Sequence, residues 1–311
     1  MFKIINEKQN DLQRIKLLNT NTGEYISVIA ELGGNVNEIV LKKGNNLYSL
    51  LDGRKSLNEF QGSEIYNSAI LFPFPNRIVE GKYELNGTSY QLPINWPQEG
   101  HAIHGFVCDK VFDVVHKQTD DDYAEITLSY KYEATYPGYP FPFQLTIVYR
   151  LDEKKFSCVI EAKNSGESSM PVNIGWHPYF SINDKIDNIK MQLPKSDIIV
   201  ADNLIPTGEK KTNTQFLKPE EINGKEFDTC FAINENGDVY EIKLFFPEEE
   251  VTMVLEQEKI FKYLQIYTPP GRKSIALEPM TGQANNFNNK EDLIVLESGE
   301  KIKTKYAVKI Q

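Results

Sequence analysis

The chain has 311 residues and carries 34 lysine and arginine residues against 44 aspartate and glutamate residues, a formal net charge of −10 at pH 7. This acidic balance disfavours nucleic acids as partners, because their phosphates attract basic surfaces. Hydrophobic residues make up 40% of the chain and charged residues 25%, which are the proportions of a soluble globular protein with a sizeable core.

Neither the N-terminal residues nor the cysteines indicate an extracellular or membrane protein. Residues 1–10 lack the apolar run of a signal peptide, and no uncharged apolar stretch is long enough to cross a bilayer. The cysteines Cys108, Cys158 and Cys230 are odd in number and widely spaced, so we expect neither a disulfide framework nor a cysteine-based metal site. We therefore expect a cytoplasmic protein without a membrane partner.

Alternation of apolar and polar residues with period two dominates the chain and predicts strands. Residues Tyr123–Tyr132 place mostly apolar groups on one side and mostly polar groups on the other, as in a half-buried strand. Further predicted strands are Tyr25–Leu32, Asn37–Lys42, Val111–Lys117, Phe143–Leu151, Phe156–Asn164, Met170–Trp176, Glu241–Phe246, Val251–Glu256, Tyr263–Tyr267, Ser274–Glu278 and Lys301–Ile310. Only two stretches, Ser63–Leu71 and Pro219–Asn223, favour short helices.

Turn sequences predict hairpins at three places, which are Asn86-Gly87, Asp152–Lys155 and Asn236–Asp238. The first pair tolerates the positive φ angles of a type I′ turn. The third would join Cys230–Asn234 to Val239–Phe246. Closely spaced strands with turns between them are typical of a sandwich or barrel, and no linker or internal repeat divides the chain. The sequence therefore predicts an all-β protein, a large antiparallel β-sandwich that forms one domain over residues 1–311.

The segment Asn173–Phe180 places a histidine where a predicted strand ends. Pro178 has no backbone donor for a sheet ladder, so the imidazole of His177 would lie at the strand end beside an indole and two aromatic rings. Histidine is the side chain best suited to proton transfer near neutral pH. The pattern fits either a catalytic histidine or a core histidine that hydrogen-bonds a backbone carbonyl.

Glu278 has the same layout as His177, since it ends an apolar strand and precedes Pro279. A carboxylate and an imidazole that face each other form a general base and general acid pair without a cofactor. The polar loop Gly282–Asn289 follows and could line a site. A surface glutamate could occupy the same position by chance.

Other polar residues are candidates for binding a ligand. Arg77 follows the proline-rich aromatic segment Phe72–Asn76 and offers a planar fork of donors. Asp228 opens a predicted strand and could accept hydrogen bonds from hydroxyl groups, while Gln265 carries an amide that both donates and accepts. The aromatic segment here and the one at Tyr136–Phe143 fit either a wall for a sugar ring or simple packing at a sandwich edge.

His101 and His104 form a second histidine cluster in a loop. A metal site would need a third ligand at a recognised spacing, and none is evident, so we expect no metal. The chain also lacks a phosphate-binding glycine loop, a nucleophile elbow and a dinucleotide fingerprint. Gly105 directly after His104 would permit a close approach of the backbone to a ligand.

Taken together, these elements resemble the aldose 1-epimerase (galactose mutarotase) family. Each matching segment is short, but the set is jointly specific and follows the family's order over most of the chain. The segments are Asn76-Arg77-Ile78, Gly81-Lys82-Tyr83, His104-Gly105, Asp109-Lys110-Val111, Tyr136-Pro137-Gly138, Asn173 with His177-Pro178-Tyr179-Phe180, Phe227-Asp228, Gln265-Ile266-Tyr267-Thr268 and Glu278-Pro279.

The resemblance implies a β-sandwich of the galactose mutarotase type that interconverts the α and β anomers of a free hexose such as glucose or galactose, with no metal or redox cofactor. It implies that Glu278 is the general base for the anomeric hydroxyl and that His177 is the general acid for the ring oxygen. His104 would hydrogen-bond near the ring oxygen. The sugar hydroxyls would be held by Asn76, Arg77, Asp228 and Gln265.

The chain departs from the better-known galactose-specific members at two positions. Phe106 stands where those members have a second glycine after the first histidine, and Pro178 stands where they have a serine after the second. The preferred sugar therefore stays open, and Phe106 would either narrow the pocket or point into the core. The alternatives are a hexose 6-phosphate epimerase, which would need a further cation, and a carbohydrate-binding protein without turnover. The oligomeric state is not predicted.

Overall fold

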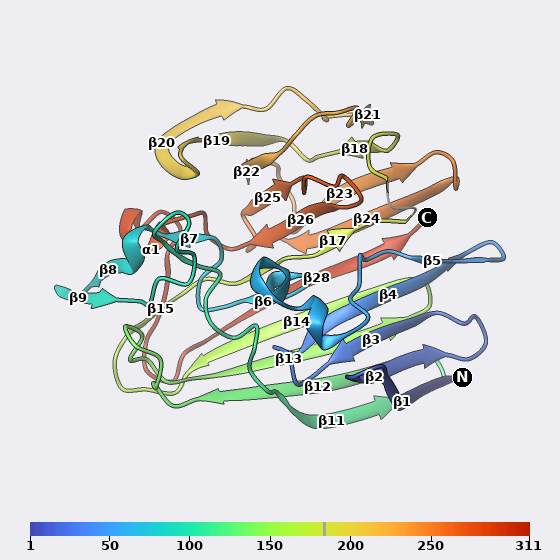
Figure 1. The fold of residues 1–311 in the computed structure, drawn as a ribbon, viewed down its shortest axis with the longest axis horizontal. Coiled ribbons are helices and arrows are strands. Elements are labelled where there is room, and N and C mark those ends of the chain that lie inside the picture. Colours follow the sequence, from blue (N-terminus) through green and yellow to red (C-terminus); the bar gives the residue numbers. More distant parts are fainter. Residues whose placement is uncertain (183–184) are drawn as a thin grey trace.

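The computed structural model describes residues 1–182 and 185–311 and is built almost entirely of antiparallel strands (Figure 1). The largest sheet has nine strands and alternates buried and solvent-facing residues along its central members. Its strands in spatial order are β11 (Asp113–Thr119), β12 (Tyr123–Tyr132), β13 (Phe143–Asp152), β14 (Lys155–Asn164), β28 (Lys301–Ile310), β24 (Val251–Glu258), β23 (Val239–Phe246), β18 (Lys190–Gln192) and β21 (Glu220–Glu221).

A second sheet of eight strands carries most of the candidate polar residues. In spatial order it contains β20 (Ile205–Thr212), β19 (Ser196–Asp202), β22 (Asp228–Ile233), β25 (Tyr263–Tyr267), β26 (Ile275–Met280), β16 (Gly175–Trp176) and β6 (Ile70–Leu71), and β17 (Tyr179–Phe180) also pairs with β26. Figure 1 shows β19, β20, β22, β25 and β26 of this sheet in the upper half of the molecule, with β19 and β20 forming a curved hairpin at the upper left.

A third sheet of five strands is formed by the N-terminal part of the chain. Its strands are β1 (Phe2–Gln9), β2 (Leu12–Asn19), β3 (Tyr25–Ile29), β4 (Asn35–Lys43) and β5 (Asn46–Ser49). It packs on the nine-stranded sheet, with β2 along β12 and β13 and with β4 along β28. One continuous hydrophobic core draws residues from all three sheets, for example Leu17, Ile147 and Leu277. The prediction of an all-β antiparallel sandwich is confirmed.

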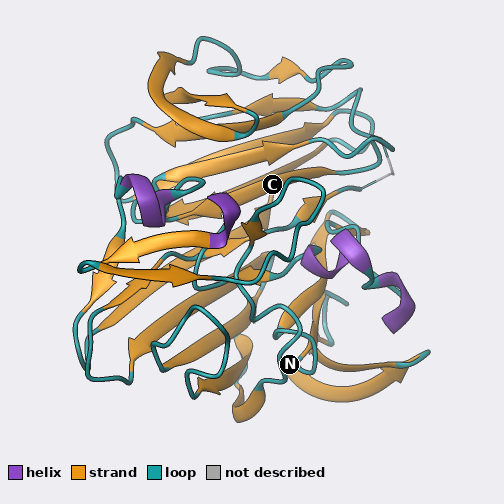
Figure 2. Ribbon diagram, turned by 60° about the vertical axis from the view of Figure 1, so that its left-hand side comes forward, coloured by secondary structure: helices purple, strands orange, loops and turns teal. Residues whose placement is uncertain are grey.

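The remaining elements are short (Figure 2). They are three two-stranded pairs, β7 (Arg77–Ile78) with β10 (Ala102–Ile103), β8 (Lys82–Leu85) with β9 (Thr88–Gln91) and β15 (Met170–Val172) with β27 (Ile294–Leu296), three 3₁₀ turns at Leu57–Glu59, Gly62–Tyr66 and Val79–Gly81, and the α-helix α1 (Asn286–Asn289). No helix in the described part of the chain has the length and apolarity needed to cross a membrane.

Every strand predicted from period-two alternation overlaps a strand of the structure, but several details of the prediction are wrong. The hairpin at Asn236–Asp238 does not exist, because β22 pairs with β19 and β25 while β23 pairs with β24 and β18. That turn instead carries the chain from one sheet to the other. The stretch Pro219–Asn223 contains the strand β21 rather than a helix, and Ser63–Leu71 continues from a 3₁₀ turn into the strand β6.

Two further predicted strands differ from the structure, one because it is divided and the other because it ends later. The stretch Met170–Trp176 divides into β15 and β16, which belong to different sheets. In addition, β26 does not stop at Glu278 but continues through Pro279 to Met280. On the side away from β25, β26 pairs with β17 at Ala276 and with β16 at Met280. Pro279 therefore lies beside the interruption between these two short strands, where a missing backbone donor is tolerated.

Candidate active site

The pairing register of β26 brings His177 and Glu278 face to face. Gly175 of β16 lies opposite Met280, and Tyr179 of β17 lies opposite Ala276. The same antiparallel register, continued across the interruption between β16 and β17, places His177 opposite Glu278. Opposite side chains on one face of a sheet are close neighbours. The sheet itself therefore assembles the pair from two segments that are about 100 residues apart in the sequence.

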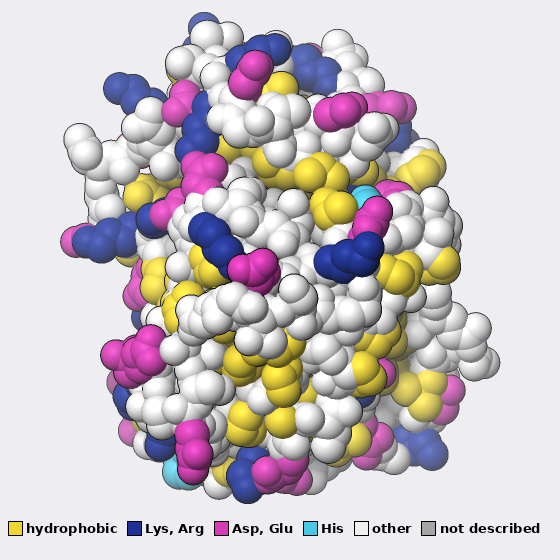
Figure 3. All heavy atoms as spheres, turned by 90° about the vertical axis from the view of Figure 1, so that its left-hand side faces the viewer, with side chains coloured by type: hydrophobic (Ala, Val, Ile, Leu, Met, Phe, Trp, Pro, Cys, Tyr) yellow, Lys and Arg dark blue, Asp and Glu magenta, His cyan; other side chains and the backbone are white. Residues whose placement is uncertain are grey.

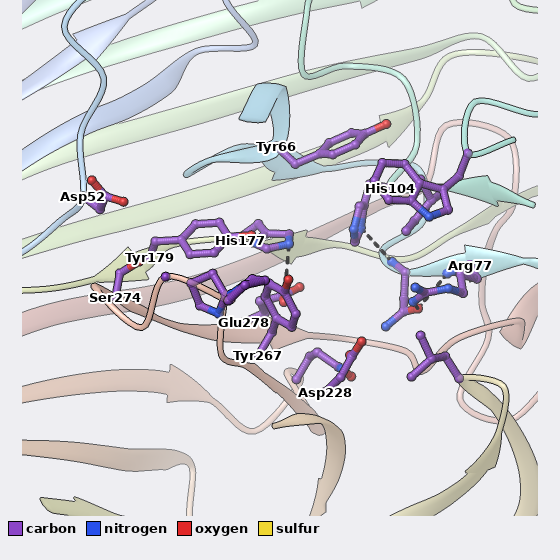
Figure 4. Close-up of a pocket in the computed structure, with 18 of the residues that line it drawn as sticks. Asp52, Tyr66, Arg77, His104, His177, Tyr179, Asp228, Tyr267, Ser274 and Glu278 are labelled. Carbon is purple, nitrogen blue, oxygen red and sulfur yellow. Dashed lines mark hydrogen bonds and ion pairs between the residues drawn. The ribbon is translucent and has the colours of Figure 1, made fainter. Parts of the chain in front are cut away.

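Figure 4 shows the two side chains meeting at the centre of the site. The Nε2 atom of His177 lies 3.5 Å from Oε1 of Glu278, and the side chains are only 8% and 3% exposed. The backbone of His177 is held on both sides, since its N–H donates to the carbonyl of Ala69 and its carbonyl accepts from the N–H of Ser68. Its ring stacks on Tyr179, with centroids 5.0 Å apart. These contacts fix the orientation of the imidazole.

Two polar atoms of this pair have no hydrogen-bond partner among the described residues. They are Nδ1 of His177 and Oε2 of Glu278, and both are buried. Buried polar atoms in proteins nearly always have a partner, and leaving one unpaired costs about 1–3 kcal/mol. The pair therefore retains hydrogen-bonding capacity that a bound ligand can satisfy.

Burial sets the protonation of the pair. It lowers the pKa of His177 to about 4, because the imidazolium would lose its hydration. Burial also raises the pKa of Glu278 well above its usual value, and the neighbouring carboxylate of Asp228 raises it further. Both shifts favour the uncharged form of each group, so a proton shared by the pair is favoured on the carboxyl group rather than on the imidazole. The contact is then a carboxylic acid beside a neutral imidazole rather than a salt bridge.

His104 follows β10 and is fixed by two hydrogen bonds to Asn76. Its backbone N–H donates to the carbonyl of Asn76 at 2.9 Å, and its Nδ1 accepts from the backbone N–H of Asn76 at 3.1 Å. Burial, followed by the nearby His177 and Arg77, holds the pKa of His104 well below its usual value. A neutral ring whose Nδ1 accepts must carry its proton on Nε2. His104 therefore presents a hydrogen-bond donor within the site.

The Arg77 guanidinium is held in place by Glu99. Its Nε donates to Oε2 of Glu99 at 2.5 Å, and its Nη2 donates to Oε1 at 2.9 Å. Its Nη1 donates to Oδ1 of Asn76 at 3.1 Å. A two-pronged arginine–carboxylate contact fixes both the position and the direction of the donors. In return, Arg77 lowers the pKa of Glu99.

Asp228 and Gln265 lie on neighbouring strands of the same sheet. The Nε2 of Gln265 donates to Oδ1 of Asp228 at 2.7 Å. Gln265 lies opposite Glu278 in the register of β25 and β26, and opposite Cys230 in the register of β25 and β22. Burial raises the pKa of Asp228, while Arg77 opposes this effect. The two side chains form a polar wall beside the pair of His177 and Glu278.

All seven residues predicted from the sequence line one cavity of about 560 Å³, which is the size of a small-molecule site. They are Asn76, Arg77, His104, His177, Asp228, Gln265 and Glu278. The rest of the wall includes four aromatic side chains, Tyr66, Trp96, Tyr179 and Tyr267. Polar groups within aromatic walls suit a ring that has both apolar faces and hydroxyl edges. In the described part of the chain, no three His, Cys, Asp or Glu side chains cluster as a metal site would require.

Sequence reasoning missed Glu99 and most of the aromatic wall. Glu99 lies in the loop before His101, and nothing local indicates that it pairs with Arg77. The aromatic segment Tyr136–Phe143 does not line the cavity but packs in the core, where the hydroxyl of Tyr139 donates to the carbonyl of Pro171 at 2.8 Å.

Two expectations about the residues after His104 are also resolved. Phe106 is 5% exposed and stacks on Tyr136 with centroids 4.2 Å apart, so it points into the core rather than narrowing the cavity. Gly105 does permit a close approach, but to the protein itself. A Cβ atom at this position would lie 1.9 Å from the carbonyl oxygen of Phe72.

Comparison with known proteins shows what this chain is similar to. The family described as aldose 1-epimerase matches residues 16–309. The uncharacterised protein YihR of Escherichia coli K12 is 29% identical, with 74% of this chain and 75% of that protein aligned. The bifunctional protein GAL10 of Kluyveromyces lactis is 28% identical over 74% of this chain, which spans only 35% of that protein's length. A galactose mutarotase-like protein from Clostridium acetobutylicum has the same fold, with a TM-score of 0.88 at 23% identity over 100% of this chain and 98% of that one.

Proposed function

Because the chain belongs to the aldose 1-epimerase family, we propose that it interconverts the α and β anomers of a free hexose such as glucose or galactose. The observation that carries this proposal is the buried pair of His177 and Glu278, which face each other at 3.5 Å in a cavity of sugar size. Mutarotation needs one proton removed and one delivered, and such a pair supplies both without a cofactor.

In the proposed reaction, ionised Glu278 removes the proton of the anomeric hydroxyl while protonated His177 delivers a proton to the ring oxygen. The bond between the anomeric carbon and the ring oxygen breaks, and the sugar opens to the aldehyde. Rotation about the adjacent carbon–carbon bond presents the other face of the carbonyl. The ring then closes with both proton transfers reversed, which gives the other anomer and restores the pair.

The pKa shifts favour ring opening. Burial makes the carboxylate of Glu278 a stronger base and the imidazolium of His177 a stronger acid. After opening, the carboxyl group is protonated and the imidazole is neutral, which is the distribution that the empty site prefers. The electrostatics of the site are therefore matched to the ring-opened intermediate rather than to the closed sugar.

The other predicted residues have supporting roles in this proposal. The Nε2–H of His104 would hydrogen-bond near the ring oxygen, and Arg77, Asn76, Asp228 and Gln265 would hold the remaining hydroxyl groups. Since the guanidinium of Arg77 is already paired with Glu99, it would act as an oriented donor for neutral hydroxyls rather than as a free cation.

Polarimetry on freshly dissolved α-glucose and α-galactose tests the proposal. The wild type should accelerate the approach to anomeric equilibrium over buffer. Glu278→Gln and His177→Asn should each lower kcat by about 10²–10⁴-fold, the usual contribution of a general acid or base. Sugar binding without any acceleration by the wild type would instead favour a carbohydrate-binding protein.

One observation favours a second candidate, a hexose 6-phosphate as substrate. Lys273 lines the cavity and is exposed, and among the described residues it has no ion-pair partner. A mobile ammonium group of this kind can bind a phosphate. The comparison of glucose with glucose 6-phosphate decides the matter. A higher kcat/KM for the phosphorylated sugar, lost in Lys273→Gln, would promote this candidate over the free hexose.

A further inference from the structure

A second compartment of about 430 Å³ adjoins the cavity that holds His177 and Glu278. The two compartments share five wall residues, which are Asn76, Arg77, Leu204, Asp228 and Gln265. The second compartment therefore adjoins the first on the side of the proposed hydroxyl-binding residues. Its outer wall is the hairpin of β19 and β20, which curls at the upper left of Figure 1.

The register of the sheet locates this compartment relative to the catalytic pair. Glu278, Gln265 and Cys230 lie opposite one another across β26, β25 and β22. Neighbouring strands are about 4.8 Å apart, so Cys230, which lines the second compartment, is about 10 Å along the sheet from the strand of Glu278. A hexose ring whose anomeric carbon lies at Glu278 would extend over Gln265. The second compartment begins where that ring would end.

The second compartment has an apolar floor and a polar rim. Ile199 and Cys230 pack with Tyr263 and Met280 in a small hydrophobic cluster beneath it. Lys211 is exposed at its edge, and Asp228 lies at its boundary with the first compartment. Sugar rings have apolar C–H faces and hydroxyl edges, so a second ring would match a surface of this kind.

The tip of the hairpin is a two-residue turn whose second residue, Leu204, lies in the walls of both compartments. Asn203 and Leu204 have φ angles of 47° and 65°. Because Asp202 pairs with Ile205, these two residues form the whole loop of the hairpin, and positive φ angles at both positions are typical of a type I′ turn. The pairing of β19 with β20 also shifts register between Ile199 and Ala201, and such irregularities often lie next to active sites. Leu204 is thereby placed in the walls of both compartments.

We propose that the second compartment binds a second sugar unit, so that the substrate is a reducing disaccharide or longer oligosaccharide. The reducing unit lies between His177 and Glu278 with its anomeric hydroxyl free. The next unit, joined through a non-anomeric oxygen, passes Leu204 and lies over the apolar floor beneath the β19–β20 hairpin. This inference rests on the proposed function, because it takes the anomeric end of the substrate to lie at the catalytic pair.

The test compares a monosaccharide with disaccharides in two measurements on the whole protein. First, kcat/KM for mutarotation is measured with the hexose that the wild type turns over best. It is then measured with a series of disaccharides that have this hexose as the reducing unit, in which glucose is attached to a different non-anomeric oxygen in each member. Second, Kd for the same sugars is measured by isothermal titration calorimetry. Ala201→Trp places an indole in the second compartment only. Thr212→Trp, an exposed position on β20 outside both compartments, is the matched control.

For at least one linkage we expect the disaccharide to exceed the monosaccharide at least tenfold in kcat/KM and in affinity. Ala201→Trp should abolish this preference while it changes kcat/KM for the monosaccharide less than twofold, and Thr212→Trp should change neither. Turnover of the monosaccharide with no preference for any disaccharide would overturn the inference, as would a preference that survives in Ala201→Trp. If no sugar is turned over, the proposed function fails, and the Kd values alone then decide whether a second unit is bound.

Discussion

At the scale of single residues, the site depends on one proton shared by two buried groups. A protonated Glu278 beside a neutral His177 and an ionised Glu278 beside a protonated His177 contain the same number of protons. The burial-induced shifts of the two pKa values stabilise the first form, while the proposed reaction starts from the second and passes through the first. This relation predicts how the rate depends on pH.

The kcat/KM for mutarotation should follow a bell-shaped pH profile. On the acidic side, kcat/KM should decline with a midpoint near pH 4. His177, whose pKa is lowered to about 4, gains a proton there, so that the pair holds two protons instead of one. The alkaline limb should fall where Glu278, whose pKa is raised, loses the shared proton. Polarimetric rates with the spontaneous reaction subtracted measure the profile. An acidic limb near 6.5, the ordinary value for histidine, would show that the imidazole is not desolvated as the structure indicates.

Glu99 is proposed to position Arg77, because it accepts two hydrogen bonds from the guanidinium and touches neither His177 nor Glu278. Glu99→Gln should raise KM about tenfold and leave kcat within about threefold, because the loss of a charge-assisted contact of about 1.5–3 kcal/mol frees the guanidinium before the chemical step. The unpaired arginine should also improve kcat/KM for glucose 6-phosphate relative to glucose. Glu161→Gln, which removes an exposed ion pair with Lys301 outside the cavity, is the control. An effect confined to kcat would contradict the positioning role.

At the scale of elements, alternation of apolar residues predicted the central strands of the nine-stranded sheet, β12, β13, β14, β28, β24 and β23, but missed strands elsewhere. β1 and β20, which are edge strands with few buried residues, were missed, and their exposure explains the weak period-two signal. β2 was missed although it is largely buried, whereas β11 was predicted although it is exposed along its whole length. The turn at Asn236–Asp238 was found, but its strands were paired wrongly. Turn sequences indicate where the chain bends, whereas partners are chosen by contacts between distant segments.

The same limit applies to the candidate site. His177 and Glu278 were singled out by their strand-end positions, and the resemblance to a family joined them to the other five residues. The sequence could not predict that the two residues lie opposite each other in the sheet, because this depends on β16 and β17 both pairing with β26. The pairing of Arg77 with Glu99 has no local signal either, since the two residues meet only when the loop before His101 folds back. The sequence thus indicated the residues, and the sheet supplied their geometry.

Gly105 lies so close to the backbone of Phe72 that there is no room for a side chain at this position. Gly105→Ala should destabilise the protein by about 2 kcal/mol or more, because the residue has a φ of 68° and the new Cβ would collide with a carbonyl oxygen. Gly87→Ala is the matched control, with a φ of 77° but no atom within 4 Å of the added Cβ. Its cost should be about 1 kcal/mol. Urea unfolding measures both, and equal losses would show that the close contact is relieved without cost.

At the scale of the whole molecule, three sheets around one core carry a site whose central pair, His177 and Glu278, is buried. The net charge of −10 is a property of the surface as a whole. Figure 3 shows acidic and basic side chains interspersed on the face at the left of Figure 1, with hydrophobic groups between them. The pair of His177 and Glu278 is buried, at 6% and 2% exposure. Its pKa shifts should affect the stability of the fold.

His177 should make the protein less stable as the pH falls from about 6.5 to about 4. Its folded pKa of about 4 lies below the unfolded value of 6.5, so the unfolded chain binds the proton first in this window. The lost free energy of unfolding is about 3 kcal/mol, at 1.36 kcal/mol per pKa unit. Between pH 7 and pH 4, the free energy of unfolding of His177→Gln should therefore fall by about 3 kcal/mol less than that of the wild type, as measured by urea unfolding. Parallel losses in the two proteins would contradict the burial of a neutral imidazole.

The central claim is that His177 and Glu278 exchange protons with the anomeric hydroxyl and the ring oxygen of an aldose. Magnetisation-exchange NMR at anomeric equilibrium measures this directly, since it gives the rate at which α-glucose and β-glucose interconvert with and without the protein. The account predicts rapid exchange with the wild type and a loss of about 10²–10⁴-fold in both Glu278→Gln and His177→Asn, with the fold intact. Exchange that stays at the buffer rate with the wild type for every aldose tested, or that survives unchanged in either variant, would contradict it.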